Sequence, residues 1–112
     1  MTDLDLLQGT LDILVLRALT WAPMHGYAVV RFIRSGSGGA FDVRDGALYT
    51  SLHRLEERGL VESEWGQSDK GKRARFYSIT TAGRRALRSE ARTFERYITA
   101  VRGVMKADPR EA

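Results

Sequence analysis

Apolar residues recur every three to four positions in four stretches of the chain, the spacing that places them on one face of an α-helix. The predicted helices run from about Gly9 to Trp21, Gly26 to Arg34, Asp45 to Arg58 and Thr81 to Ala107. Pro23 ends the first helix, and Gly59 follows the third at the position where a glycine commonly closes a helix. Asp45 and Thr80 carry side-chain oxygens at the starts of the third and fourth helices, so both are predicted N-caps.

Two stretches between the third and fourth helices alternate apolar and polar residues, as strands with one buried face do. They are "LVESEWGQ" and "RARFYSIT", and the polar, turn-forming "QSDKGK" between them predicts a two-stranded hairpin. The order helix, helix, helix, hairpin, helix is typical of a winged helix-turn-helix. We therefore predict a mainly α fold with a two-stranded β-hairpin. Residues 1–80 would form the winged helix-turn-helix domain, and residues 81–112 a long C-terminal dimerisation helix with its tail. An all-α bundle with an attached hairpin is the competing fold.

The composition is that of an ordinary globular domain, with 112 residues, 43% hydrophobic and 29% charged. The absence of cysteine excludes disulfides and thiolate metal sites and fits a reducing compartment. The acidic N-terminal "MTDLDLL" lacks the layout of a secretory signal, and no apolar run is long enough to cross a membrane. We expect a soluble, cytoplasmic protein that does not associate with a membrane.

Positive charge is concentrated in one part of the chain. The formal net charge is +4, but residues 66–92 hold eight basic residues against two acidic ones. That segment therefore carries +6 and the remainder −2. A basic segment on a nearly neutral body suits a surface that binds a polyanion, because contacts with phosphate release bound counterions. A solvated charged face is the alternative interpretation.

The third helix has two dissimilar faces. With 100° per residue, Leu48, Leu52 and Leu55 fall within a sector of about 60° and form a core stripe. The opposite face is small or hydrogen-bonding over its first two turns, where a helix can approach DNA closely, contact base edges and favour phosphate. A solvated helix would more often fill this face with Glu and Lys. The residues predicted to contact DNA are Gly46, Ala47, Tyr49, Thr50, His53 and Arg54.

The hairpin has a basic tip and a basic second strand. Such a wing can lay Lys and Arg along a minor groove or a row of phosphates. Its predicted DNA contacts are Lys70, Lys72, Arg73 and Arg75. Val61, Tyr77 and Ile79 share a face and are predicted to pack on the third helix. Trp65 is ambiguous: one interpretation has it covering the edge of the core beneath the wing, and it is assigned no ligand role.

The last helix carries apolar residues spaced 4, 3, 4, 3 and 4, the two-in-seven seam of a coiled coil. The seam residues are Leu87, Ala91, Phe94, Ile98, Val101 and Met105. A small winged helix cannot cover this seam along its whole length, so we predict a homodimer through the same helix of a second copy. Leu7 and Leu11 are assigned to the same interface. The alternative is that the seam folds back on the first helix of its own chain, and both arrangements can hold together. A dimer would place two recognition helices about one DNA turn apart, which matches a palindromic site.

No catalytic constellation is evident in the sequence. His25 and His53 lie in different predicted elements, and neither is judged to have a carboxylate at metal-ligand spacing. Nucleophile-elbow, phosphate-loop and dinucleotide motifs are also absent, so we predict no enzyme, cofactor or metal. His25 is predicted to form a hydrogen bond at the start of the second helix. Tyr27 either touches a phosphate through its hydroxyl or simply packs. Both residues are counted among the candidate DNA contacts.

Four segments together closely resemble the PadR family of transcriptional regulators. They are "LLQGTLDILVLRAL", "MHGYAVVRFI", "GALYTSLHRLEERGLVESEW" and "KGKRARFYSITTAGRRAL", and they span Leu6 to Leu87, about three quarters of the chain. Their combination is specific, although each piece alone would be weak. The resemblance implies a winged helix-turn-helix with a C-terminal dimerisation helix. It also implies an operator-binding homodimer, usually a repressor, that a small molecule releases.

Carried over by position, the family's major-groove helix corresponds to Asp45–Arg58 and its wing to Trp65–Ser78. The tyrosines that lie near phosphate in the family correspond to Tyr27 and Tyr49. The chain departs from the family at Thr50 and Thr81, where prolines are usual, and this bears on the helix starts and not on the fold.

The single C-terminal helix makes the chain similar to the short branch of that family. Some short members bind flat aromatic compounds between protomers through a Trp on this helix. Here the helix has Phe94 and Tyr97 but no Trp. The resemblance places a small aromatic effector among the expected partners. Because the helix lacks the Trp, no effector pocket is assigned.

The sequence thus predicts a sequence-specific DNA-binding transcriptional regulator. It would be a homodimeric repressor that binds a palindromic operator in double-stranded DNA. The alternative, from another class, is a winged-helix protein-interaction module that docks through its C-terminal helix without reading DNA. That alternative predicts no preference for the DNA upstream of the protein's own coding sequence.

Overall fold

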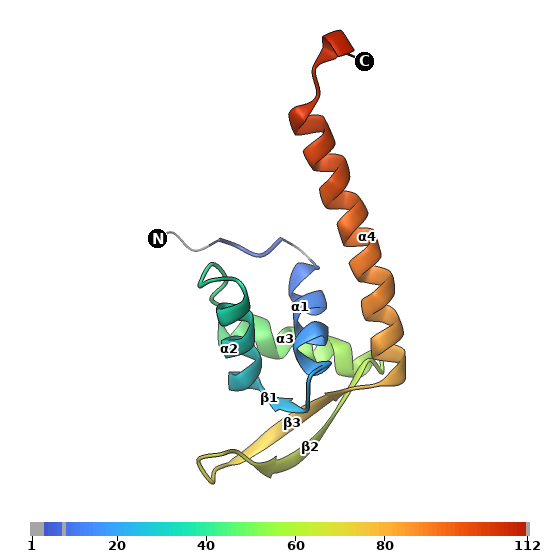
Figure 1. The fold of residues 1–112 in the computed structure, drawn as a ribbon. Coiled ribbons are helices and arrows are strands. Elements are labelled where there is room, and N and C mark those ends of the chain that lie inside the picture. The colour runs from blue at the N-terminus through green and yellow to red at the C-terminus, as the bar shows by residue number, and fades with distance from the viewer. Residues whose placement is uncertain (1–3, 8, 112) are drawn as a thin grey trace.

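The apolar core lies where three helices meet the base of a β-hairpin (Figure 1). The computed structural model describes residues 4–7 and 9–111. The elements are α1 (Thr10–Leu19), β1 (Met24–His25), α2 (Gly26–Gly36), α3 (Asp45–Glu57), β2 (Val61–Gln67), β3 (Arg73–Ile79), α4 (Thr81–Lys106) and a short 3-10 helix (Pro109–Glu111) within the tail. The predicted mainly α fold with a wing and a long last helix is confirmed. Residues 1–3, 8 and 112, which belong to the two predicted domains, lie outside the described residues.

The sheet has three strands where the sequence predicted two. The order is β1-β3-β2, and the additional strand β1 pairs antiparallel with β3. Met24 lies opposite Tyr77, and His25 opposite Phe76. Two residues are too few to show the alternation that marks a strand in a sequence. This short pairing ties the connection between α1 and α2 to the wing.

The core draws on every element of the winged helix-turn-helix. The apolar stripe of α3 is completely covered: Leu48 is 1% exposed, and Leu52 and Leu55 are 0% exposed. Val61 and Tyr77 are also buried, whereas Ile79 is half-buried against the same core. The predicted packing of the hairpin's apolar face is therefore confirmed. The other buried apolar residues are Val15, Leu16, Ala18, Leu19, Val29, Ile33, Val43 and Leu60.

Of the two predicted ends of α3, the N-cap is wrong and the closing glycine is confirmed. Arg44, not Asp45, occupies the N-cap position, and no side chain caps the helix start. Asp45 is instead the first helical residue, where its charge favours the positive end of the helix dipole. At the other end Gly59 has φ of +73°, and the Leu60 N–H donates to the Leu55 carbonyl at 2.9 Å. This Schellman closure turns the chain into β2 and needs a glycine.

The start of α4 is locked onto the corner between α3 and β2. The Thr80 hydroxyl donates to the Gly59 carbonyl at 2.8 Å, and its oxygen accepts from the Gly83 N–H at 3.0 Å, which confirms the predicted N-cap. A Cβ added at Gly83 would lie 2.1 Å from the Leu60 carbonyl oxygen. Only glycine allows the helix to approach so closely. The direction in which α4 leaves the domain is therefore set at this corner.

Beyond that corner, α4 passes α1 and continues past the rest of the molecule (Figure 1). Leu87 packs against the core, but further along the seam Val101 is 43% exposed and Met105 is 80% exposed. The projecting helix makes the molecule long, with extents of 62 × 35 × 21 Å. No described helix is long and apolar enough to cross a membrane.

Candidate nucleic-acid interface

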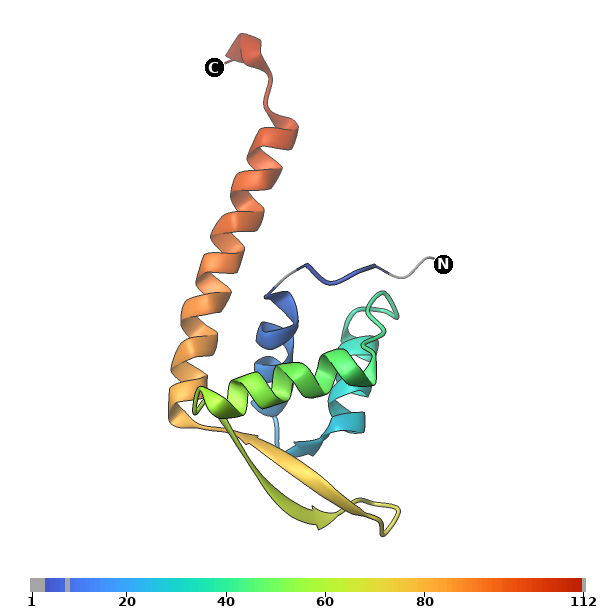
Figure 2. The same cartoon turned by 180° about the vertical axis from the view of Figure 1, so that it is seen from behind.

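The outer face of α3 is open to solvent. Figure 2 shows α3 running across the surface above the wing. Because the leucine stripe is held in the core, the residues on the other side of the helix point outward. All six predicted contacts on α3 are exposed: Gly46, Ala47, Tyr49, Thr50, His53 and Arg54.

The start of α2 supplies a second part of this surface. The Ala28 N–H donates to Nδ1 of His25 at 3.2 Å, so His25 caps the helix as predicted. Because Nδ1 accepts this bond, the neutral ring carries its proton on Nε2. Tyr27 is 64% exposed, and the Arg31 guanidinium lies 4.8 Å from its ring centre. Arg31 is not among the predicted contacts, although its spacing of four from Tyr27 places the two side chains side by side on the helix.

Gly26 allows α2 and α3 to meet at this surface. A Cβ at Gly26 would lie 2.8 Å from the Tyr49 hydroxyl oxygen and 3.2 Å from a methyl group of Leu48. The glycine of the "HGY" turn thus leaves room for the Tyr49 side chain. Tyr49 remains 51% exposed, with its ring beside the helix start.

The two faces of the wing differ in charge. Trp65 lies opposite Arg75, and the next pair on the same face is Gln67 with Arg73. The reverse face carries Glu62 and Glu64, both exposed. The cationic face is the one that also carries buried Tyr77 and therefore looks toward α3. A polyanion can approach the wing favourably only from that side.

Trp65 holds the two wing arginines. Its side chain is 56% exposed, so it does not cover the edge of the core. The guanidinium carbons of Arg73 and Arg75 lie 4.3 Å and 5.6 Å from its ring centre. Arg75 also donates from Nε to the Ser63 hydroxyl at 2.8 Å. These cation–π contacts restrict side chains that would otherwise sample many rotamers in water.

A groove of about 620 Å³ lies between the start of α2, Tyr49 and the cationic face of the wing. We call it the wing groove. The predicted DNA contacts that it brings together are His25, Tyr27, Tyr49, Lys70, Lys72, Arg73 and Arg75. The remaining contacts predicted on α3 lie outside it, further along the exposed helix face.

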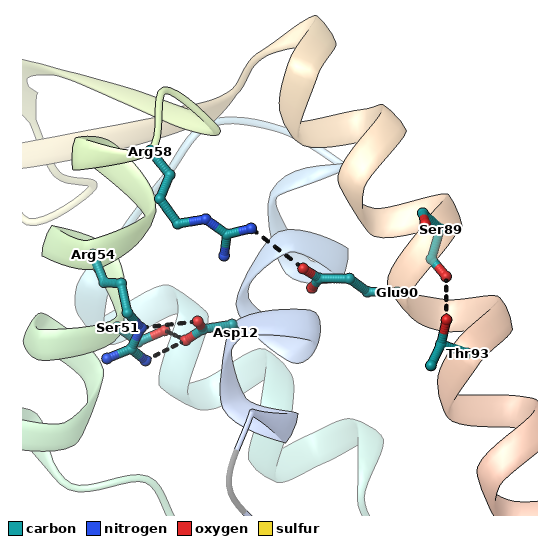
Figure 3. A network of polar contacts seen from close by, with 7 residues as sticks. All are labelled: Asp12, Ser51, Arg54, Arg58, Ser89, Glu90 and Thr93. Carbon is teal, nitrogen blue, oxygen red and sulfur yellow. Dashed lines mark hydrogen bonds and ion pairs between the residues drawn. The ribbon is translucent and has the colours of Figure 1, made fainter.

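Arg54 is engaged within the protein. It donates from Nε and Nη2 to the two oxygens of Asp12 at 3.0 Å and 2.6 Å, and Ser51 donates to the same carboxylate at 2.6 Å (Figure 3). Asp12 on α1 is only 7% exposed. Burial alone would raise the pKa of Asp12, but the bonds from Arg54 and Ser51 outweigh it and hold that pKa below its ordinary value. Sequence reasoning could not find this pair, since its partners are 42 residues apart.

Further polar contacts lie near the C-terminal end of α3, where Glu56 accepts from Ser63 at 2.7 Å and lies 3.9 Å from Arg75 of the wing. Arg58 reaches Glu90 of α4 at 3.4 Å, as Figure 3 also shows. His53 lies 3.4 Å from Glu57 one turn along, so the view that neither histidine has a carboxylate at helical spacing was wrong. Among residues 4–7 and 9–111, no three side chains of the metal-binding types gather into a set that could hold a metal ion.

The residues assigned to the dimer interface are covered to different extents. Leu11, Leu87, Ala91, Phe94 and Ile98 are half-buried, whereas Leu7, Val101 and Met105 are exposed. Between α1 and α4 lies a cavity of about 610 Å³, which we call the α1–α4 cavity. Its walls include Leu7, Ile13, Phe94 and Tyr97 together with the charged residues Asp12, Arg58 and Glu90.

An exposed third helix beside a basic antiparallel wing defines the winged helix-turn-helix class of DNA-binding proteins. Within that class, residues 15–89 match the model of the transcriptional regulator PadR-like family. The chain belongs to this family and is a DNA-binding transcriptional regulator.

Solved structures of the same family share the fold. A PadR family transcriptional regulator from Eggerthella lenta is 30% identical, with a TM-score of 0.77 over 90% of this chain and 86% of that one. A PadR family transcription regulator from Clostridium difficile is 27% identical, with a TM-score of 0.72 over 88% of this chain and all of that one.

Among curated relatives, a transcriptional regulator from Mycobacterium tuberculosis is 43% identical over 63 residues, which cover 56% of this chain and 58% of the relative. An uncharacterised protein from a Streptomyces fradiae transposon is 40% identical over 85 residues, 76% of this chain but only 23% of that protein.

Proposed function

We propose that the protein is a homodimeric repressor that binds a palindromic operator in double-stranded DNA. The observation that carries this proposal is the continuity of one exposed surface, made of the outer face of α3, the wing groove and the cationic face of the wing. Residues 1–80 would bind the operator, and residues 81–112 would hold the two chains together. As a regulator of transcription, the protein would act in the cytoplasm.

On α3, the absence of large side chains at Gly46 and Ala47 lets the helix start approach the floor of a major groove. Thr50 and His53 follow on the same exposed face and would contact base edges. The Nε and Nη2 nitrogens of Arg54 already donate to Asp12, so only Nη1 and the second N–H of Nη2 remain to reach a phosphate. We therefore assign Arg54 to positioning the helix and not to reading sequence.

On the wing, Arg73 would contact a phosphate while stacked on Trp65, because a stacked guanidinium keeps hydrogen-bond donors free at its edge. Arg75 would do so only through its Nη groups, since its Nε donates to Ser63 and its Nη2 lies 3.9 Å from Glu56. Lys70 and Lys72 at the tip would extend this contact. His25 and Tyr27 at the start of α2 would donate from Nε2 and the hydroxyl to the same strand, since both line the wing groove.

The proposed dimer rests on the uncovered seam of α4. Ile98 is only half-buried, and Val101 and Met105 are exposed within one chain. A second copy of the same helix would cover them symmetrically. A two-fold symmetric dimer would then present two copies of α3 to two half-sites.

We also propose release of DNA by a small aromatic effector. The support for this is the α1–α4 cavity, whose walls include the aromatic rings of Phe94 and Tyr97. Arg58 at the C-cap of α3 and Glu90 on α4 line the same cavity and contact each other. An occupant there would touch the only ion pair that joins α4 to α3 among the described residues.

A titration of duplex DNA at several stated salt concentrations tests the proposed function. The wild-type protein should prefer the DNA upstream of its own coding sequence over a random duplex. The Arg73→Ala/Arg75→Ala variant should lose affinity for both, and the slope of log K against log salt should fall by about 1.8, at about 0.9 per phosphate contact. Glu62→Gln/Glu64→Gln on the reverse face is the matched control and should not weaken binding.

A salt slope unchanged in the double arginine variant would remove the wing from the DNA contact. Equal affinity of the wild-type protein for its own upstream DNA and for the random duplex would instead favour the protein-interaction module.

A further inference from the structure

Seven basic residues form a stripe along α4 that the operator surface does not use. At 100° per residue they fall within a sector of about 120°, and they extend over about 33 Å of the helix. All seven are exposed. We call them the α4 stripe: Arg84, Arg85, Arg88, Arg92, Arg96, Arg102 and Lys106. Glu95 is the single acidic residue within the sector.

The α4 stripe faces away from both surfaces described above. Glu90, which contacts Arg58 of α3, lies about 180° around the helix from the centre of the stripe. The apolar seam is centred about 120° from the stripe. The centre of the stripe therefore points neither toward α3 nor toward the side on which a second α4 would pack, whereas Arg84 and Arg102 at its edge lie about 60° from the centre of the seam and border it.

The charge pattern is not that of a helix face that merely stays soluble. A solvated face usually pairs opposite charges four residues apart, but Arg84, Arg88, Arg92 and Arg96 repeat the same charge at that spacing. Such pairs repel and destabilise the helix. Among the described residues, no cation of the stripe has a carboxylate within 4 Å. A bound polyanion would remove this repulsion.

We propose that the α4 stripe is a second, sequence-independent contact for the backbone of duplex DNA, so that the operator-bound protein can hold another DNA segment. Its length of about 33 Å is close to one turn of B-DNA, about 34 Å. Six of its seven cations are arginines, whose planar fork suits phosphate oxygens. The sector contains no apolar residue, which argues against a protein partner, because protein interfaces bury apolar and aromatic side chains at their centre.

A two-duplex capture assay with the full chain tests this proposal. A biotinylated duplex from the upstream region is held on beads, protein is added, and capture of a fluorescent random 30-base-pair duplex is measured at several salt concentrations. The Arg88→Gln/Arg92→Gln/Arg96→Gln variant should still bind the first duplex. Its capture of the second should fall at least about tenfold, and the salt slope for the second should drop by about 2.7. Glu95→Gln should strengthen second-duplex capture.

Four results separate the stripe from the operator surface. Unchanged capture of the second duplex by the triple variant would overturn the proposal. Conversion of that variant to a monomer, seen by light scattering, would also overturn it, since the stripe would then lie against the partner chain. Equal competition by single-stranded DNA would show that the stripe does not recognise a duplex. If Arg73→Ala/Arg75→Ala no longer stays on the bead-held duplex but still binds the random duplex in solution, more weakly than the wild type, the proposal stands although the operator contact has failed.

Discussion

Helices α3 and α4 are both amphipathic, but the chain covers their apolar faces very differently. The three leucines of α3 are at most 1% exposed, whereas Val101 and Met105 on α4 are 43% and 80% exposed. Helix α3 completes a core inside one chain, whereas α4 presents a seam that one chain leaves partly uncovered. An apolar pattern in a sequence therefore predicts burial without telling which molecule provides the cover.

The polar links of α3 show the same contrast. Toward α1, Arg54 donates two hydrogen bonds to the buried carboxylate of Asp12. Toward α4, Arg58 reaches Glu90 across 3.4 Å, with side chains 48% and 35% exposed. Water screens the second pair far more than the first. Helix α3 is thus firmly attached to its own domain and loosely attached to the projecting helix α4.

The largest effect is expected from charges placed on the α4 seam. Phe94→Glu/Ile98→Glu would remove two apolar contacts per chain and set four like charges against one another across the proposed interface. The dimer dissociation constant should rise at least about 1,000-fold, since each lost apolar side chain costs about 1.5–3 kcal/mol. Light scattering over a concentration series measures this change. Thr99→Glu, about 120° around α4 from the centre of the seam, is the matched control, and a dimer that persists in the double variant would place the interface elsewhere.

The next largest effect concerns a single core position of α3. Leu52→Ala should lower the free energy of unfolding by about 2–5 kcal/mol, because the removed side chain is fully buried and leaves a cavity. Met105→Ala on α4 should change it by less than about 0.5 kcal/mol under dilute conditions where the chain is a monomer. Urea denaturation of both variants at one low concentration gives the comparison. Equal losses would contradict the view that α4 is uncovered within one chain.

The smallest effect separates the two ion pairs of α3. Asp12→Ala should lower the free energy of unfolding by about 1–3 kcal/mol, because buried Ser51 loses its acceptor. Glu90→Gln should change it by less than about 1 kcal/mol.

The Asp12 effect should also depend on pH. The pKa of this carboxyl is lowered in the folded protein, so its contribution is present above the unfolded-state value of about 3.9 and is lost as pH falls through the lowered value. Denaturation curves of wild type and Asp12→Ala should therefore converge as the medium becomes more acidic than about pH 3.9. A gap between them that stays constant in acid would show that the charge of Asp12 does not matter.

Much of the candidate site could be predicted from spacing alone. The outward face of α3 follows from the positions of its leucines, and the basic character of the wing follows from its composition. Gly59 and Thr80 correctly predicted the end of α3 and the start of α4, because helix closure and capping depend on neighbours only a few residues away. The missing N-cap at Asp45 shows the limit of such local rules, since Arg44 takes that position without a side-chain bond.

Only the tertiary structure decided the contacts between residues that lie far apart in the sequence. The strand β1, the engagement of Arg54 by Asp12, and the stacking of Arg73 on Trp65 each join segments that no local pattern connects. Gly83 is the clearest case: it lies at the start of a helix, and its need for glycine comes from the Leu60 carbonyl of another element. By itself the sequence determined the four long helices and the two strands of the wing, their buried faces and the sign of their charge, because these depend on periodicity and composition. The structure decided which of those charges are engaged within the protein and which stay open to DNA, because this depends on which elements pack together.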